Sequence, residues 1–153
     1  MNRKVFLLAD DDSDDREMFC EAIVSIDKNI ICSSAQDGSE ALNMIEELEQ
    51  KPNLIFLDVN MPVMNGWQCL KRLKEDERYK AIPVIMISTS SHQREMDIAA
   101  DFGVLCYITK PNDFNQLKKV LQVIVANLGS DLEKALQGLQ ASGFYFVYVL
   151  TSE

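Results

Sequence analysis

Apolar runs of strand length alternate along this chain with segments of helical periodicity. Five runs have the composition of strands, and they cover residues 4–9, 30–35, 54–58, 84–87 and 104–109. Apolar residues at spacings of three and four predict helices near residues 18–23, 41–48, 67–73, 93–102 and 114–127. Because parallel strands need crossover helices, the alternation predicts an α/β fold: a doubly wound, five-stranded parallel sheet with helices on both faces.

The third run is the most continuously apolar, as expected of a central strand, and it ends in Asp58. An ionised carboxylate is costly to bury, so we expect Asp58 where this strand leaves the core. A tight turn should follow, because Pro62 restricts φ and the pair Asn65-Gly66 tolerates positive φ. The alternative for Asp58 is a purely structural residue that caps the next helix.

Chemically useful residues also end the other strands: Asp10, Asp11, Ser88, Thr89 and Lys110. The carboxyl ends of parallel strands share one sheet edge, so these residues should lie near Asp58. Carboxylates at close range repel each other, and Mg²⁺ is a suitable counter-ion because it binds carboxylates together with phosphate oxygens. Hydroxyls and an amine can bind the remaining phosphate oxygens. The set predicts phosphoryl transfer to Asp58 as the nucleophile.

Four motifs in order resemble those of the receiver domain of bacterial two-component response regulators (CheY-like), over residues 3–128. They are Asp10-Asp11, Asp58 within Asp-x-x-Met-Pro-x-Met-x-Gly, Ile82-Pro83-Val84 leading to Ser88, and Lys110-Pro111. The acidic start and the run of hydroxyl residues from Ser88 are most similar to single-domain receivers that pair with phytochrome-type kinases. Ser88 stands where Thr is commoner in the family.

The resemblance implies a flavodoxin-like strand order of 2-1-3-4-5 and the following chemistry. A sensor histidine kinase or phosphotransfer protein would phosphorylate Asp58 in a Mg²⁺-dependent reaction. The implied metal ligands are Asp11, Asp58 and the backbone carbonyl of Asn60, with Asp10 acting through water. Ser88 and Tyr107 match the family's switch pair, and the phosphate-binding set is Ser88, Thr89 and Lys110.

Residues 129–153 form a C-terminal extension that begins with Gly129-Ser130, a predicted domain boundary. A short helix at 131–141 and an apolar run at 144–150 are expected there, with no separate output domain. We therefore expect a stand-alone regulator and not an enzyme. Phosphorylation of this regulator would reshape the surface of the fourth helix, fifth strand and fifth helix. The downstream target is unknown. The extension should fold back or self-associate, and a homodimer would use that surface or the extension.

Composition and charge exclude some classes of binding partner. The chain has 153 residues, 47% of them hydrophobic, and a net charge of −9, which disfavours nucleic-acid binding. Its apolar runs are too short for a membrane span, and its start is too short for a signal peptide, so we expect a cytoplasmic protein.

Three groups of residues have structural interpretations. The four cysteines are widely spaced and are expected to be reduced and buried, with a disulfide or metal framework as the alternative: Cys20, Cys32, Cys69 and Cys106. The acids Asp12, Asp14 and Asp15 suit a helix N-terminus as cap and dipole residues. His92, the one histidine, has no paired ligand and is expected to be exposed.

Two rival functions remain. A phosphatase of the haloacid dehalogenase class also uses a strand-end Asp nucleophile, but it needs a second Asp two residues later, where this chain has Asn60. A degenerate receiver would act only as a phosphate-independent scaffold, which the intact acids and Lys110 argue against.

Overall fold

The computed structural model describes residues 3–89, 93–129 and 131–150, and the predicted α/β fold is confirmed there. The strands are β1 Val5–Ala9, β2 Ile31–Ala35, β3 Leu54–Asp58, β4 Val84–Ser88, β5 Cys106–Thr109 and β6 Val147–Val149. The helices are α1 Ser13–Ile26, α2 Gly38–Glu47, α3 Gly66–Glu75, α4 Gln93–Asp101, α5 Phe114–Ala126 and α6 Leu132–Ala141. The interpretation of His92 falls outside the described residues.

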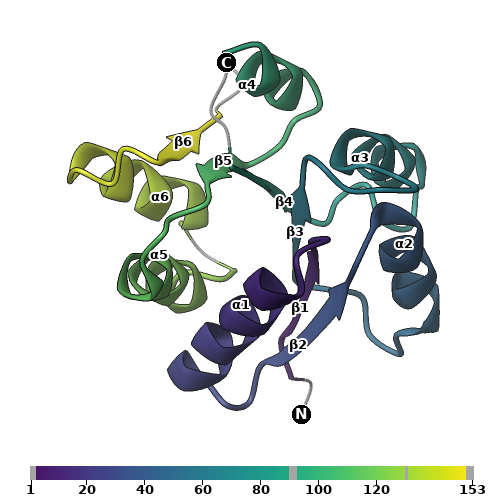
Figure 1. Cartoon of the computed structure of the whole chain (residues 1–153), viewed down its shortest axis with the longest axis horizontal. Coiled ribbons are helices and arrows are strands. Elements are labelled where there is room, and N and C mark those ends of the chain that lie inside the picture. The colour runs from purple at the N-terminus through teal and green to yellow at the C-terminus, as the bar shows by residue number, and fades with distance from the viewer. Residues whose placement is uncertain (1–2, 90–92, 130, 151–153) are drawn as a thin grey trace.

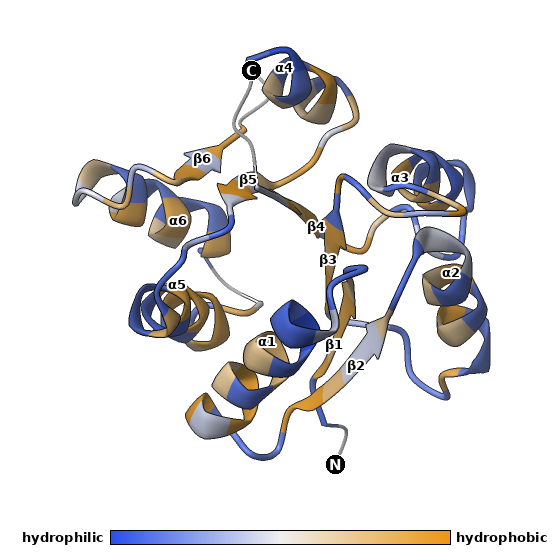
Figure 2. Cartoon of the chain, viewed as in Figure 1, coloured by the Kyte–Doolittle hydropathy of each residue, from blue (hydrophilic) through white to orange (hydrophobic). Residues whose placement is uncertain are grey.

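The sheet has the order β2-β1-β3-β4-β5-β6, and its first five strands are parallel, as predicted. Helices α1, α5 and α6 lie on one face, and α2, α3 and α4 lie on the other (Figure 1). Each face has its own apolar cluster. The inner strands are hydrophobic along their length, whereas the helices turn polar residues outward (Figure 2). Burial on both faces explains why β3 is a continuous apolar run.

Strand register brings the predicted site residues to one edge. Asp58 at the end of β3 is in register with Ile87, one residue before the end of β4. Ser88 is in register with Thr109, and the amide of Lys110 donates to the carbonyl of Ser88 at 2.7 Å. Backbone hydrogen bonds thus hold the last residues of β3, β4 and β5 within one residue of the same level of the sheet.

The turn after β3 differs from its prediction. Asn65 does not adopt positive φ; it caps α3 and accepts a hydrogen bond from the amide of Gln68 at 2.9 Å. The left-handed residue is Val63, with φ of 65°. Gly66 is required for another reason, because a Cβ at this position would overlap the carbonyl oxygen of Asp58. Asn65 therefore serves as the N-cap of α3, and the pair Asn65-Gly66 does not form the expected turn with positive φ.

The C-terminal extension folds back onto the domain and adds a sixth, antiparallel strand to the predicted five. β6 pairs with the outer edge of β5, joining Tyr107 to Tyr148 in register, and α6 packs beside α5. Helix α6 matches the predicted 131–141, but only Val147–Val149 of the run 144–150 is strand. Strand β5 starts two residues late because Gly103 turns the chain with φ of 73° and the amide of Val104 still bonds to Ala99 in α4.

The cysteine prediction was half wrong. Cys20 on α1 and Cys32 on β2 are joined in a disulfide, with a Cα–Cα distance of 5.8 Å. Sequence spacing could not reveal this pair, because it depends on how α1 lies across the sheet. Cys69 and Cys106 are free and buried in the described structure, as predicted.

Candidate functional site

Three carboxylates lie together where β1 and β3 end. Asp10 and Asp58 are buried, with exposed fractions of 1% and 4%, and Asp11 is exposed. An oxygen from each of the three lies within 4.8 Å of the others. The carboxylate of Asp10 also braces the chain, because it accepts a hydrogen bond from the amide of Asp12 at 3.0 Å. The sheet therefore places the predicted acids in one small, half-buried cluster.

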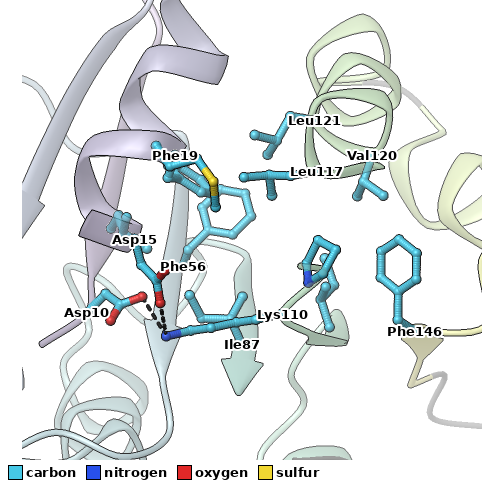
Figure 3. Close-up of a pocket in the computed structure, with 14 residues that line it drawn as sticks. Asp10, Asp15, Phe19, Phe56, Ile87, Lys110, Leu117, Val120, Leu121 and Phe146 are labelled. Atoms are coloured by element: carbon cyan, nitrogen blue, oxygen red, sulfur yellow. Dashed lines mark hydrogen bonds and ion pairs between the residues drawn. The ribbon is translucent and has the colours of Figure 1, made fainter. Parts of the chain in front are cut away.

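Lys110 reaches this cluster from the far side, after β5. Its Nζ forms an ion pair with Oδ2 of Asp10 at 2.8 Å and donates a hydrogen bond to Oδ2 of Asp58 at 3.1 Å. Its third contact is Oδ2 of Asp15 at 3.0 Å. Figure 3 shows Asp10 and Asp15 pointing toward the ammonium, below the apolar side chains of α1 and α5.

Sequence reasoning missed the contact of Asp15, which it interpreted only as a helix-dipole residue. Asp15 does lie in the first turn of α1, and Asp12 is the cap, accepting from the amides of Asp14 and Asp15. The available signal was only its place in the sequence, at the start of the helix that follows the acids at the end of β1.

Burial and charge perturb the groups of the cluster. Burial, together with the repulsion of Asp10, raises the pKa of Asp58 to about 7, although Lys110 acts in the opposite direction. Burial alone would lower the pKa of Lys110, but hydrogen bonds to Asp10 and Asp15 raise it above its ordinary value. The site therefore has more carboxylates than the single positive charge of Lys110 can neutralise. Close carboxylates with such an excess fit a hard divalent cation with oxygen ligands.

The other predicted residues differ in their contacts and burial. The amide of Asn60 donates to Oδ1 of Asp58 at 3.3 Å. Ser88 is fully buried at the end of β4, whereas Thr89 is exposed. Tyr107 is also fully buried, and its hydroxyl donates to Oε2 of Glu95 on α4 at 2.7 Å.

An apolar cavity of about 50 Å³ adjoins the site between α1 and α5. Asp10, Asp15 and Lys110 line its polar end, and Phe146 of the extension lines the other side (Figure 3). The amide of Thr109, next to Lys110, donates to the carbonyl of Phe146 at 2.9 Å. The extension is therefore in direct contact with the strand that positions Lys110.

Comparison with known proteins gives this arrangement a family. The family model described as the response regulator receiver domain matches residues 6–122. The chain belongs to the response regulator receiver family. Response regulator Rcp1 of Synechocystis sp. is 31% identical over 128 residues, which cover 79% of this chain and 86% of Rcp1. The phosphorylated cyanobacterial phytochrome response regulator RcpA has a similar structure, with a TM-score of 0.76 and 29% identity over 83% of this chain and 94% of RcpA.

Two further findings bear on chemistry. A structure of Rcp1 in its Mn²⁺-bound form is similar, with a TM-score of 0.71 and 28% identity over 80% of this chain and 92% of Rcp1. A protein-glutamate methylesterase/protein-glutamine glutaminase of Methanococcus maripaludis is 33% identical over 73% of this chain, but only 30% of that enzyme is covered. Receivers are signalling modules that partner with histidine kinases or phosphotransfer proteins, and this chain is a CheY-like response regulator. Its described helices are all too short or too polar to cross a bilayer.

Proposed function

We propose that Asp58 accepts a phosphoryl group from a sensor histidine kinase or phosphotransfer protein, with Mg²⁺ bound at the acid cluster. The observation that carries the proposal is the meeting of Asp10, Asp11, Asp58 and Lys110 at one sheet edge. Asp11, Asp58 and the carbonyl of Asn60 would hold the cation, with Asp10 acting through water. When bound, the cation would neutralise the acids and bind phosphoryl oxygens.

The residues of this chain have distinct tasks in the transfer. An oxygen of Asp58 attacks phosphorus and forms the new P–O bond, while the bond to the donor breaks and the donor keeps its electron pair. The ammonium of Lys110 already lies 3.1 Å from Oδ2 of Asp58, so it can stabilise the charge on the incoming group without a large movement. Ser88, Thr89 and Lys110 would bind the phosphoryl oxygens, and slow autodephosphorylation would return the site to its starting state.

Ser88 and Tyr107 would transmit the change to a protein surface. Tyr107 faces inward and is covered by β6, where the rings of Tyr107 and Tyr148 lie 6.5 Å apart. The surface of α4, β5 and α5, which phosphorylation is expected to reshape, differs here because β6 covers the outer edge of β5. A downstream protein would therefore contact α4 together with the extension.

Mass spectrometry after incubation with acetyl phosphate and Mg²⁺ tests this function. We expect one phosphoryl group per chain, lost in Asp58→Asn and in the absence of the cation. Beryllofluoride with Mg²⁺ should bind the wild type and fail to bind Asp58→Ala. A wild type that neither labels nor binds beryllofluoride would be a scaffold, and sustained hydrolysis of a phosphomonoester would indicate a phosphatase.

A further inference from the structure

Three carboxylates surround the ammonium of Lys110: its Nζ lies 2.8 Å from Oδ2 of Asp10, 3.0 Å from Oδ2 of Asp15 and 3.1 Å from Oδ2 of Asp58. Phosphorylation turns the carboxylate of Asp58 into an acyl phosphate, so Asp10 and Asp15 remain as the carboxylates that compete with the phosphoryl oxygens for the ammonium. The choice of partner decides how readily the site accepts the group.

Burial identifies the partner that yields. The side chain of Asp10 is 1% exposed and that of Asp58 is 6% exposed, whereas that of Asp15 is 35% exposed. A buried carboxylate that loses its partner is costly because water cannot replace it, but Asp15 can turn to water. Asp15 also lies in the first turn of α1, where the helix dipole stabilises a free carboxylate.

We infer that Asp15 is a further positioning residue of the phosphoryl-transfer site, one that competes with the phosphoryl group for Lys110. The inference rests on the proposed function of Asp58. When all are ionised, the four carboxylates of Asp10, Asp11, Asp15 and Asp58 against one ammonium leave a formal charge of −3. The charge of Asp15 thus attracts the cation but opposes an anionic phosphoryl donor. It sets the balance between the two ligands.

This role predicts two changes of opposite direction in Asp15→Asn. With acetyl phosphate and saturating Mg²⁺, Asp58 should be labelled roughly fivefold to tenfold faster, the size expected of one nearby unit charge in a partly shielded site. The affinity for Mg²⁺ alone should fall by a similar factor. Phosphorus passes from acetate oxygen to an oxygen of Asp58, acetate leaves with the electron pair, and no proton needs to move.

Asp14→Asn is the matched control, because Asp14 carries the same charge in the same helical turn, is exposed, and lies outside the Lys110 cluster. It should leave both values close to wild type. Asp15→Ser repeats the test in case the amide forms a new contact, and thermal unfolding checks that each variant folds.

Faster labelling with weaker Mg²⁺ binding in both Asp15 variants, but not in Asp14→Asn, would support the competition. Unchanged or slower labelling, or an equal effect in Asp14→Asn, would overturn it. If the variants merely loosened α1, labelling of Asp58 would become slower and Mg²⁺ binding weaker. That result also counts against the inference. If the wild type itself is not labelled, the proposed function fails, which is a distinguishable result.

Discussion

Asp58 is a buried carboxylate whose pKa is strongly raised. Its ordinary pKa is 3.8, and burial next to Asp10 raises the pKa to about 7 in the folded chain. The folded state therefore binds more protons than the unfolded state between these values, so stability must fall as the pH rises through this window. A bound cation would offset the repulsion at this carboxylate, which ties the site's energetics to its ligand.

We expect Asp58→Asn, in the absence of divalent cations, to match the wild type near pH 4 and to become more stable than it above pH 7. The difference should reach on the order of 2–4 kcal/mol, since a tenfold change in a protonation equilibrium corresponds to about 1.4 kcal/mol. Urea unfolding at a series of pH values with a chelator measures it. Adding Mg²⁺ should restore the wild type at high pH. A constant difference across the series would contradict this account.

Gly66 is the second residue on which the site depends. Because a Cβ there would overlap the carbonyl oxygen of Asp58, Gly66→Ala should push α3 away from the end of β3. We expect a loss of about 2 kcal/mol or more in unfolding free energy, together with slower labelling of Asp58. Gly138→Ala is the control, since nothing lies within 4 Å of a Cβ at this position of α6. It should stabilise the chain by up to about 1 kcal/mol.

Helix α6 acts as part of the core. Leu136 is fully buried, in the same apolar cluster as Val120 and Leu121 of α5. Leu136→Ala should cost about 2–5 kcal/mol of unfolding free energy, from lost burial and the cavity left behind. Gln137→Ala, on the exposed side of the same helix, should stay within about 0.5 kcal/mol of wild type. Denaturant unfolding compares the two, and equal effects would show that α6 is not packed as described.

Strand β6 is an edge strand of the sheet, and its exposed edge is poorly suited to pairing with another strand. Its outward amides already have partners in the chain: that of Val147 donates to the carbonyl of Phe144 at 3.1 Å, and that of Val149 donates to Oε1 of Gln140 at 3.4 Å. An edge whose amides are occupied is a poor template for strand addition. The apolar run at 144–150 therefore pairs and packs within the chain, except for Tyr145, which is exposed.

At the scale of the whole molecule, the extension covers one edge of the sheet and one side of α5. Removing residues 131–153 would uncover the edge of β5 and the side of α5 that packs on α6. We expect the shortened chain to unfold at a lower temperature and to self-associate, since exposed apolar surface and an open edge favour both. Light scattering and thermal unfolding of the two chains test this. A shortened chain that stays as stable and as monodisperse as the full chain would contradict it.

The parallel five-stranded core and the convergence of Asp10, Asp58 and Lys110 followed from the sequence alone. Continuous apolar runs must be covered on both faces, and parallel connections then bring the strand ends to one edge. The motifs also identified the family. These features depend on local pattern and on a topological rule, and neither requires knowledge of how helices pack.

Only the tertiary structure decided the contacts between elements. The ion pair of Asp15 with Lys110, the hydrogen bond of Tyr107 to Glu95, the disulfide of Cys20 with Cys32 and the pairing of β6 with β5 each join segments from different elements. Such contacts are set by the rotation and placement of whole helices and strands. A one-dimensional pattern shows which face of an element is apolar, but it does not show which residue of a neighbouring element that face meets.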